Sequence, residues 1–179
     1  PICSGAPNVL LLSATPDSLG ETFDWIGPIG FTSTLQNPSF TAPPASASGT
    51  YKVITHWNGC NDSDLVIVVV DSTPALPTIS SNTPQCSGHR DTLRLFSADV
   101  TLGSMYTWTG PGGFTSLLQN PTIPSPHVPA TGTYTITVSI PYDGLACSNK
   151  NTTDVVVDST PYLPVVGSNG PICSQNTLL

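Results

Sequence analysis

The chain has 179 residues, enough for one large or two small domains, and only 8% of them are charged, against roughly 25% in an average soluble domain. Eleven acidic residues outnumber four cations (Lys52, Arg90, Arg94 and Lys150), so the net charge is −7. Nucleic acid and anionic membrane surfaces both attract clustered Lys and Arg, so this balance argues against either as a partner. No apolar run is long enough to insert into a membrane.

The composition favours β-structure on a secreted protein. The chain contains 19 Pro and 15 Gly, and no window repeats apolar residues at helical spacing over three turns. Thr and Val, which β-strands prefer, are abundant. A surface poor in charge and rich in Ser, Thr, Asn and Gly is typical of secreted and cell-surface proteins. We therefore predict an all-β chain of short strands separated by turns.

The sequence repeats itself. Residues 30–38 read GFTSTLQNP, and residues 113–121 read GFTSLLQNP, an offset of 83. After about four extra residues near Pro141 the offset becomes 87, and a third copy opens at Pro171-Ile172-Cys173-Ser174, which echoes residues 1–4. We predict a first repeat at residues 1–74 that lacks its first strand, a second at 75–161, and the first strands of a truncated third at 162–179. Because the chain starts inside a motif, we expect it to be part of a longer protein.

Each repeat is a series of short strands between turn signals, the pattern of a β-sandwich. In the second repeat we expect strands at residues 92–97, 105–109, 134–140 and 154–158. Their alternating apolar residues would meet across two sheets. The large members of that core are matched between the repeats: Trp25 with Trp108, and Tyr51 with Tyr134.

The repeated nine-residue phrase contains no acid and no metal ligand. The glycines around Pro111 indicate a turn, and Gln119-Asn120-Pro121 should end one strand before the next begins, because the residue before a proline is held extended. We interpret the phrase as a turn, a short edge strand and a corner that serve the scaffold. A ligand-contacting loop is the alternative.

Taken in order, these motifs resemble the Ig-like repeats of Bacteroidetes surface proteins, which look related to PKD domains. The matching segments are Cys-Ser-Gly, an aromatic two residues before Trp, Gly-Pro, Gly-Phe, Gln-Asn-Pro, Gly-Thr-Tyr, a second Cys and a Val-rich strand. Similar repeats occur in gliding-type adhesins and other cargo of the type IX secretion system. The resemblance covers essentially the whole chain. It implies tandem Ig-like β-sandwich domains with one disulfide per domain, in an extracellular array without catalytic activity.

The cysteines depart from the antibody pattern. There the second Cys follows the corner Tyr by two residues, but those positions here are Val53 and Ile136. We predict the pairs Cys3–Cys60 and Cys86–Cys147, each closing one end of a sandwich and stabilising it by ~4 kcal/mol. Cys173 would then have its partner outside the chain. Metal binding is the alternative, but no CxxC or Cys–His ligand spacing occurs. Disulfides predict an extracellular or cell-surface location.

Other candidate sites are weaker. His56, His89 and His127 fall at non-equivalent places in the repeats, so we expect exposed or packing histidines. Residues 58–64 gather oxygen ligands that could bind calcium, but they lack the frame of a calcium loop and suit a solvated turn. Asp17, Glu21 and Asp24 could supply paired carboxylates for glycoside hydrolysis, but their counterparts Val100, Ser104 and Thr107 cannot. We expect no enzyme, no cofactor and no metal.

Two further sites are candidates for modification. Asp71-Ser72-Thr73 and Asp158-Ser159-Thr160 look like the motif that Bacteroidetes O-glycosylate, at Ser72 and Ser159. A plain β-turn explains both segments too.

We therefore expect a structural spacer repeat of a long extracellular adhesin or surface filament, whose partners are neighbouring repeats of the same protein. Prolines at the joints would make a semi-rigid rod. Two alternatives remain open at this stage. The first is an adhesion module that binds surface polysaccharide, for which Trp57 is the candidate. The second is the subunit of a non-covalently polymerised fibre, which an unpaired apolar edge strand at residues 66–70 would favour.

Overall fold

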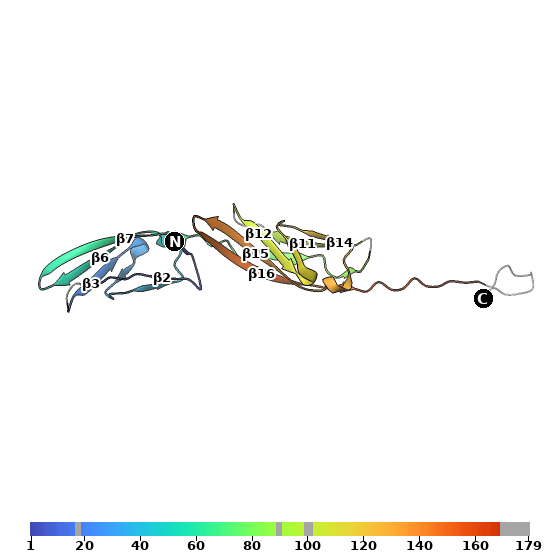
Figure 1. Cartoon of the computed structure of the whole chain (residues 1–179), viewed down its shortest axis with the longest axis horizontal. Coiled ribbons are helices and arrows are strands. Elements are labelled where there is room, and N and C mark those ends of the chain that lie inside the picture. The colour runs from blue at the N-terminus through green and yellow to red at the C-terminus, as the bar shows by residue number, and fades with distance from the viewer. Residues whose placement is uncertain (17–18, 89–90, 99–101, 169–179) are drawn as a thin grey trace, which may run out of the picture.

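A computed structural model describes residues 1–16, 19–88, 91–98 and 102–168. Throughout these residues the regular structure consists of β-strands and single 3-10 turns. They form two β-sandwiches that follow one another along the long axis of the molecule (Figure 1). We call them unit 1 and unit 2; unit 1 contains β1 to β8 and unit 2 contains β9 to β17.

Unit 2 packs a three-stranded sheet against a four-stranded sheet. The smaller sheet has the order β14-β11-β9, formed by Thr122–Pro124, Thr92–Ala98 and Thr78–Ser81. The larger has the order β13-β12-β15-β16, formed by Phe114–Ser116, Met105–Gly110, Gly132–Tyr142 and Leu145–Val155. A short parallel pair joins β10 (Gln85–Cys86) to β17 (Val157–Asp158).

Unit 1 repeats this plan. Its smaller sheet pairs β2 (Val9–Leu11) with β5 (Ser39–Thr41). Its larger sheet has the order β4-β3-β6-β7, formed by Thr32–Ser33, Thr22–Ile26, Gly49–Trp57 and Cys60–Val68. The parallel pair is β1 (Ile2–Cys3) with β8 (Val70–Asp71). Among the described residues, unit 1 has no counterpart of β9.

Each unit has its own core between the sheets. Trp25 and Tyr51 are 2% and 0% exposed in unit 1, and Trp108 and Tyr134 are both 0% exposed in unit 2. Leu10, Leu12, Phe23 and Val53 complete the first cluster, and Leu93, Leu95, Ile136, Val138, Val155 and Val157 complete the second. The aromatic side chains are the largest members of each cluster and each removes a large apolar area from water.

The Gly-Pro and Gly-Thr-Tyr motifs are two halves of one packing arrangement. The Tyr134 ring lies against Gly110, where a Cβ atom would approach the ring carbons to 2.4 Å, and the Tyr134 hydroxyl donates to Ala130 O at 3.0 Å. Gly132, at φ +142°, leaves room for the ring of Pro111. Unit 1 repeats the hydroxyl contact from Tyr51 to Ala47 O, also at 3.0 Å. Tyrosine in this position ties a corner of the sandwich to the backbone upstream.

The nine-residue phrase crosses from one sheet to the other. Its phenylalanine, Phe114, packs edge-on to Tyr134 with ring centroids 5.5 Å apart. At the corner, Asn120 Oδ1 accepts from Ser97 N at 2.8 Å and Gln119 Nε2 donates to Ser97 O at 2.9 Å. The two side chains therefore bind β11 as a neighbouring strand would.

Most of the solvated turn expected at residues 58–64 is instead strand. The residues after the Tyr strand, including both second cysteines, belong to β7 and β16, which form long hairpins with β6 and β15. They are edge strands in the order of their sheets, and they carry polar residues on both faces, so the apolar alternation that revealed the other strands is missing. The strand expected at residues 154–158 is the end of β16 and the separate β17.

Candidate functional site

The main feature outside the two cores is the joint between the units, which a disulfide closes. Cys3 of β1 is bonded to Cys147 of β16, with Cα atoms 5.5 Å apart. The predicted pairs Cys3–Cys60 and Cys86–Cys147 are therefore wrong. Cys60 and Cys86 are exposed thiols.

The physical reason is the length of the strand between the paired positions. Cys60 begins β7, a strand of nine residues, while Cys3 lies beside β8, which follows the other end of β7. At about 3.3 Å per residue the two cysteines are separated by roughly 30 Å, whereas a disulfide requires Cα atoms within about 7 Å. Each unit thus has its two cysteines at opposite ends.

Hydrogen bonds reinforce the joint on both sides of the disulfide. The Tyr142 hydroxyl, at the tip of the β15–β16 hairpin, donates to Ser72 O at 2.9 Å. Asn149 Nδ2 donates to Pro74 O, and Asn151 Nδ2 donates to Pro77 O, both at 2.9 Å. The segment that links the units is therefore held along β16, and Pro74 and Pro77 are fully buried there.

Sequence reasoning missed the residues that make these contacts. Tyr142 lies in the insertion that distinguishes the second repeat, and the insertion itself was the available signal. Asn149 and Asn151 are two residues apart, so they share a face of a strand, but this is informative only once residues 145–155 are known to be a strand.

The ends of the strands at the joint are anchored by a small clamp. The Ser4 Oγ accepts from Thr73 N at 2.9 Å, and Thr73 Oγ1 donates to Ser4 O at 2.7 Å. Ser87 and Thr160 form the equivalent clamp in unit 2. An open groove of about 730 Å³ lies beside the joint, and Lys150 is the single cation in its lining.

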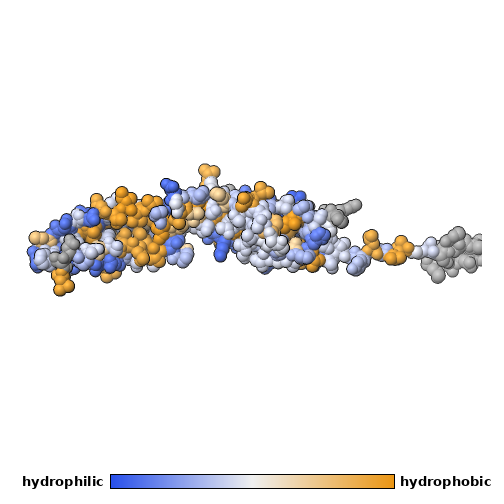
Figure 2. Space-filling view, viewed as in Figure 1, coloured by the Kyte–Doolittle hydropathy of each residue, from blue (hydrophilic) through white to orange (hydrophobic). Residues whose placement is uncertain are grey.

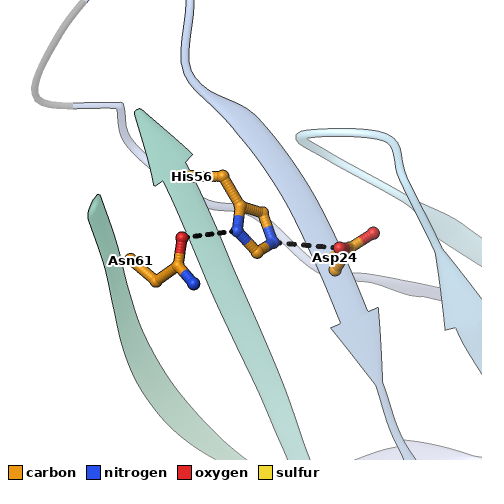
Figure 3. Close-up of polar contacts among 3 residues, drawn as sticks. All are labelled: Asp24, His56 and Asn61. Carbon is orange, nitrogen blue, oxygen red and sulfur yellow. Dashed lines mark hydrogen bonds and ion pairs between the residues drawn. The ribbon is translucent and has the colours of Figure 1, made fainter. Parts of the chain in front are cut away.

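A second polar cluster lies on the larger sheet of unit 1 (Figure 3). His56 Nε2 contacts Asp24 Oδ2 at 2.9 Å, and His56 Nδ1 contacts Asn61 Oδ1 at 2.7 Å, so the cluster joins three neighbouring strands. Both ring nitrogens are engaged by neighbouring side chains of the same sheet. The register places Thr107, Ser139 and Ser148 at these positions in unit 2. We interpret the cluster as a local tie of β3, β6 and β7.

The remaining candidate residues are dispersed. Asp62 Oδ1 and Asp64 Oδ1 each accept from the next backbone N–H along β7, at 2.7 Å. In the described part of the chain no three His, Cys, Asp or Glu side chains gather into a possible metal site. His127, Ser72 and Ser159 are exposed. Asp17, His89, Val100 and Cys173 lie outside the described residues.

No helix in the described ranges is both long and apolar enough to span a bilayer. No family model matches the sequence, and no curated protein matches it. Solved structures do resemble it. Extracellular domains 3–5 of Drosophila OTK align at a TM-score of 0.50 and 14% identity, over 88% of this chain and 58% of that chain.

Two further structures align less closely in shape. Murine CEACAM1b has a TM-score of 0.43 and 14% identity, over 87% of this chain and 94% of that chain. The three N-terminal domains of the outer capsid protein Hoc of bacteriophage RB49 have a TM-score of 0.39 and 14% identity, over 87% of this chain and 55% of that chain. This chain thus spans little more than half of the OTK and Hoc structures.

The sheet order, the tyrosine corner and the likeness to OTK define the class: the chain consists of tandem Ig-like β-sandwich domains. Domains of this class are common in surface and adhesion proteins, and a disulfide-bonded example is typical of an extracytoplasmic location.

Proposed function

We propose that the chain is a spacer segment of a longer secreted surface protein, in which successive Ig-like units form a semi-rigid rod. The observation that carries the proposal is the joint between the units. The disulfide Cys3–Cys147 ties the β15–β16 hairpin of unit 2 to the first strand of unit 1, and Tyr142, Asn149 and Asn151 of the same hairpin hold the linking segment. A joint built for free rotation would instead be a solvated linker rich in Gly and Ser.

The disulfide is also a second covalent connection between the units that can bear tension. A pull along the chain passes through the linking segment at residues 72–77, but the disulfide connects the first strand of unit 1 directly to the edge strand of unit 2. The two units therefore remain joined along two covalent routes. This construction suits a protein that holds a terminal domain at a fixed distance from a cell surface.

The finer assignment rests on the sequence motifs. The repeated motifs support a bacterial surface adhesin of the gliding type, secreted by the type IX system. Ser72 and Ser159, both exposed and both next to a Ser–Thr clamp, are the proposed O-glycosylation sites. Mass spectrometry of the protein from its natural host would detect the glycans, and unmodified peptides at both sites would contradict this part of the proposal.

Small-angle X-ray scattering of the 179-residue chain tests the rod. We expect an elongated monomer with a narrow distribution of inter-unit angles, which broadens when a reductant opens Cys3–Cys147. A chain that is equally flexible with and without reductant would contradict the proposal. The Cys60→Ser variant, which alters an exposed thiol away from the joint, is the matched control.

Two observations favour a second candidate, a fibre assembled from separate chains. The edge strand β7 exposes Leu65, Val66 and Ile67 at 61%, 42% and 78%, and apolar surface gathers over unit 1 in Figure 2. Residues 162–168 are extended and exposed, and they correspond in sequence to β9, the strand without a counterpart in unit 1. A second copy could therefore add this segment to unit 1.

Sedimentation separates the two candidates. A fibre predicts concentration-dependent association of the full chain that disappears when residues 162–179 are removed, whereas a spacer predicts a monomer in both cases. A glycan array run on the same samples tests the adhesion alternative. Its candidate, Trp57, is 46% exposed, while its counterpart Ile140 is half-buried at the joint.

A further inference from the structure

The two exposed cysteines occupy the same structural positions as the two bonded ones. Cys86 of β10 faces Asp158 of β17 in a parallel pair, just as Cys3 of β1 faces Asp71 of β8. The neighbouring hydrogen bonds also repeat: Ser4 N donates to Asp71 O and Ser87 N donates to Asp158 O, both at 2.8 Å. The half of a joint that contains Cys3 is therefore already formed around Cys86.

The other half of the joint repeats as well. Cys147 is the cross-strand partner of Ile140, and Cys60 is the cross-strand partner of Trp57. Ile140 and Trp57 each lie six residues after the core tyrosine of their strand, Tyr134 or Tyr51. Cys60 thus has the register of Cys147, although its hairpin is shorter. Cys147 is fully buried, whereas Cys60 and Trp57 are exposed. They form the last pair of the β6–β7 hairpin, which extends to the end of unit 1 away from unit 2 (Figure 1).

We propose that Cys60 and Cys86 are the two halves of further joints, so that every pair of consecutive units is linked by a disulfide. The first cysteine of each unit bonds the second cysteine of the unit that follows. Cys86 would therefore bond the following unit, and Cys60 would bond the preceding one. The partner in each case is a further unit of the same array, and this inference rests on the proposed spacer function.

The chemistry is a thiol–disulfide exchange. The thiol of Cys86 and the thiol of the second cysteine in the following unit together give up two hydrogen atoms as their sulfur–sulfur bond forms. The disulfide of an oxidoreductase in the oxidising compartment accepts these hydrogen atoms and is reduced to a dithiol. Both thiols are exposed, so a mixed disulfide with the oxidoreductase can form at either. The docked unit then supplies the second thiol, as unit 2 does for Cys3.

The sequence itself provides the means to build the missing joint. Residues 171–174 are identical to residues 1–4, so a chain of residues 1–170 followed by residues 1–179 continues the repeat without a foreign linker. In this duplicated chain, unit 2 of the first copy precedes unit 1 of the second copy. The outer thiols are removed by Cys60→Ser in the first copy, Cys86→Ser in the second and Cys173→Ser.

The test is digestion of the oxidised monomer without reductant, after alkylation of free thiols, followed by mass spectrometry. We expect a Cys86 peptide linked to a Cys60 peptide, together with Cys3–Cys147 peptides from both copies. Alkylation of Cys86 should change from complete in the 179-residue chain to absent in the duplicated chain. The control with Cys86→Ser in the first copy as well should leave Cys60 of the second copy fully alkylated.

Two results would overturn the inference, and they differ in what else they affect. If Cys86 and Cys60 are alkylated while Cys3–Cys147 forms, the disulfide is specific to one joint and the spacer function stands. If Cys86 is linked to Cys147 of its own unit, the joint described here is wrong, and the rod proposed from it fails too.

Discussion

At the scale of single residues, the glycines of the two Gly-Pro motifs are required by a neighbouring ring and not by their own backbone angles. Gly110 has φ −168°, an extended value that any residue adopts, but the ring of Tyr134 occupies the place of a side chain. Gly27 has the same relation to Tyr51. The Gly-Pro and Gly-Thr-Tyr motifs recur together in both units because the tyrosine ring fills the space that the glycine leaves open.

We expect Gly110→Ala to destabilise unit 2 by about 2–3 kcal/mol, since the added methyl group must displace a fully buried ring. Gly144→Ala is the control: φ is +78°, but nothing lies within 4 Å of the added Cβ, so only left-handed strain of about 1 kcal/mol applies. Hydrogen exchange of unit 2 peptides measures both. An equal loss in the two variants would contradict the steric explanation.

The core tyrosines should make the protein sensitive to alkali. Burial raises the pKa of both Tyr51 and Tyr134 above the ordinary value of 10.0. The unfolded chain therefore releases these protons at a lower pH than the folded chain, and stability is complete below about pH 10 and falls as the pH rises through the folded-state pKa.

Denaturant titrations between pH 8 and pH 12 check this sign. In Tyr51→Phe/Tyr134→Phe we expect a lower stability at neutral pH, by about 1–2 kcal/mol for each carbonyl, Ala47 O and Ala130 O, that is left without its donor. The decline above about pH 10 should become shallower in the same variant. A decline as steep as in the parent chain would assign the alkaline sensitivity to other groups.

At the scale of elements, the Gln-Asn-Pro corner replaces a strand. Asn37 Oδ1 and Gln36 Nε2 bind the backbone of Ala14 at 3.2 and 2.8 Å, as Asn120 and Gln119 bind Ser97. The chain passes from one sheet to the other at this point, so the corner holds the two layers together. The exposed Leu118 of the same phrase makes no such contact among those described.

We expect Asn120→Ala to destabilise unit 2 by about 1–2 kcal/mol, because Ser97 N loses its acceptor in a partly buried place. Leu118→Ala, at a side chain 67% exposed, should change stability by no more than about 0.5 kcal/mol. Chemical denaturation of the two variants compares them directly. If the phrase instead served to contact a ligand, Asn120→Ala would leave the stability of unit 2 unchanged.

At the scale of the whole molecule, the disulfide joins units and does not staple them. We expect Cys3→Ser to leave the stability of each unit within about 1 kcal/mol of the parent, because no core residue is altered. A disulfide within a unit would instead cost ~4 kcal/mol when removed. Calorimetry of the parent and variant distinguishes the two, with Cys86→Ser, at an exposed thiol, as the control.

Local sequence was enough to predict several strands and the presence of two similar β-sandwiches. Alternating apolar residues located β11, β12 and β15, and the repeated aromatic and glycine motifs marked two sandwiches of one design, because strand period and turn chemistry are properties of neighbouring residues. The edge strands β7 and β16 carry no such period. β7 is exposed along almost its whole length, and the half-buried face of β16 consists largely of polar residues such as Asn149, Asn151 and Thr153.

The partner of each cysteine was decided only by the tertiary structure. The sequence shows which cysteines are equivalent, but a disulfide depends on which chain ends meet in space. The rigid strands β7 and β16 hold the two cysteines of one unit at opposite ends, and the stacking of the units brings Cys3 to Cys147. The sequence therefore identifies which cysteines correspond between the repeats, but only the tertiary structure shows that the disulfide links one repeat to the next.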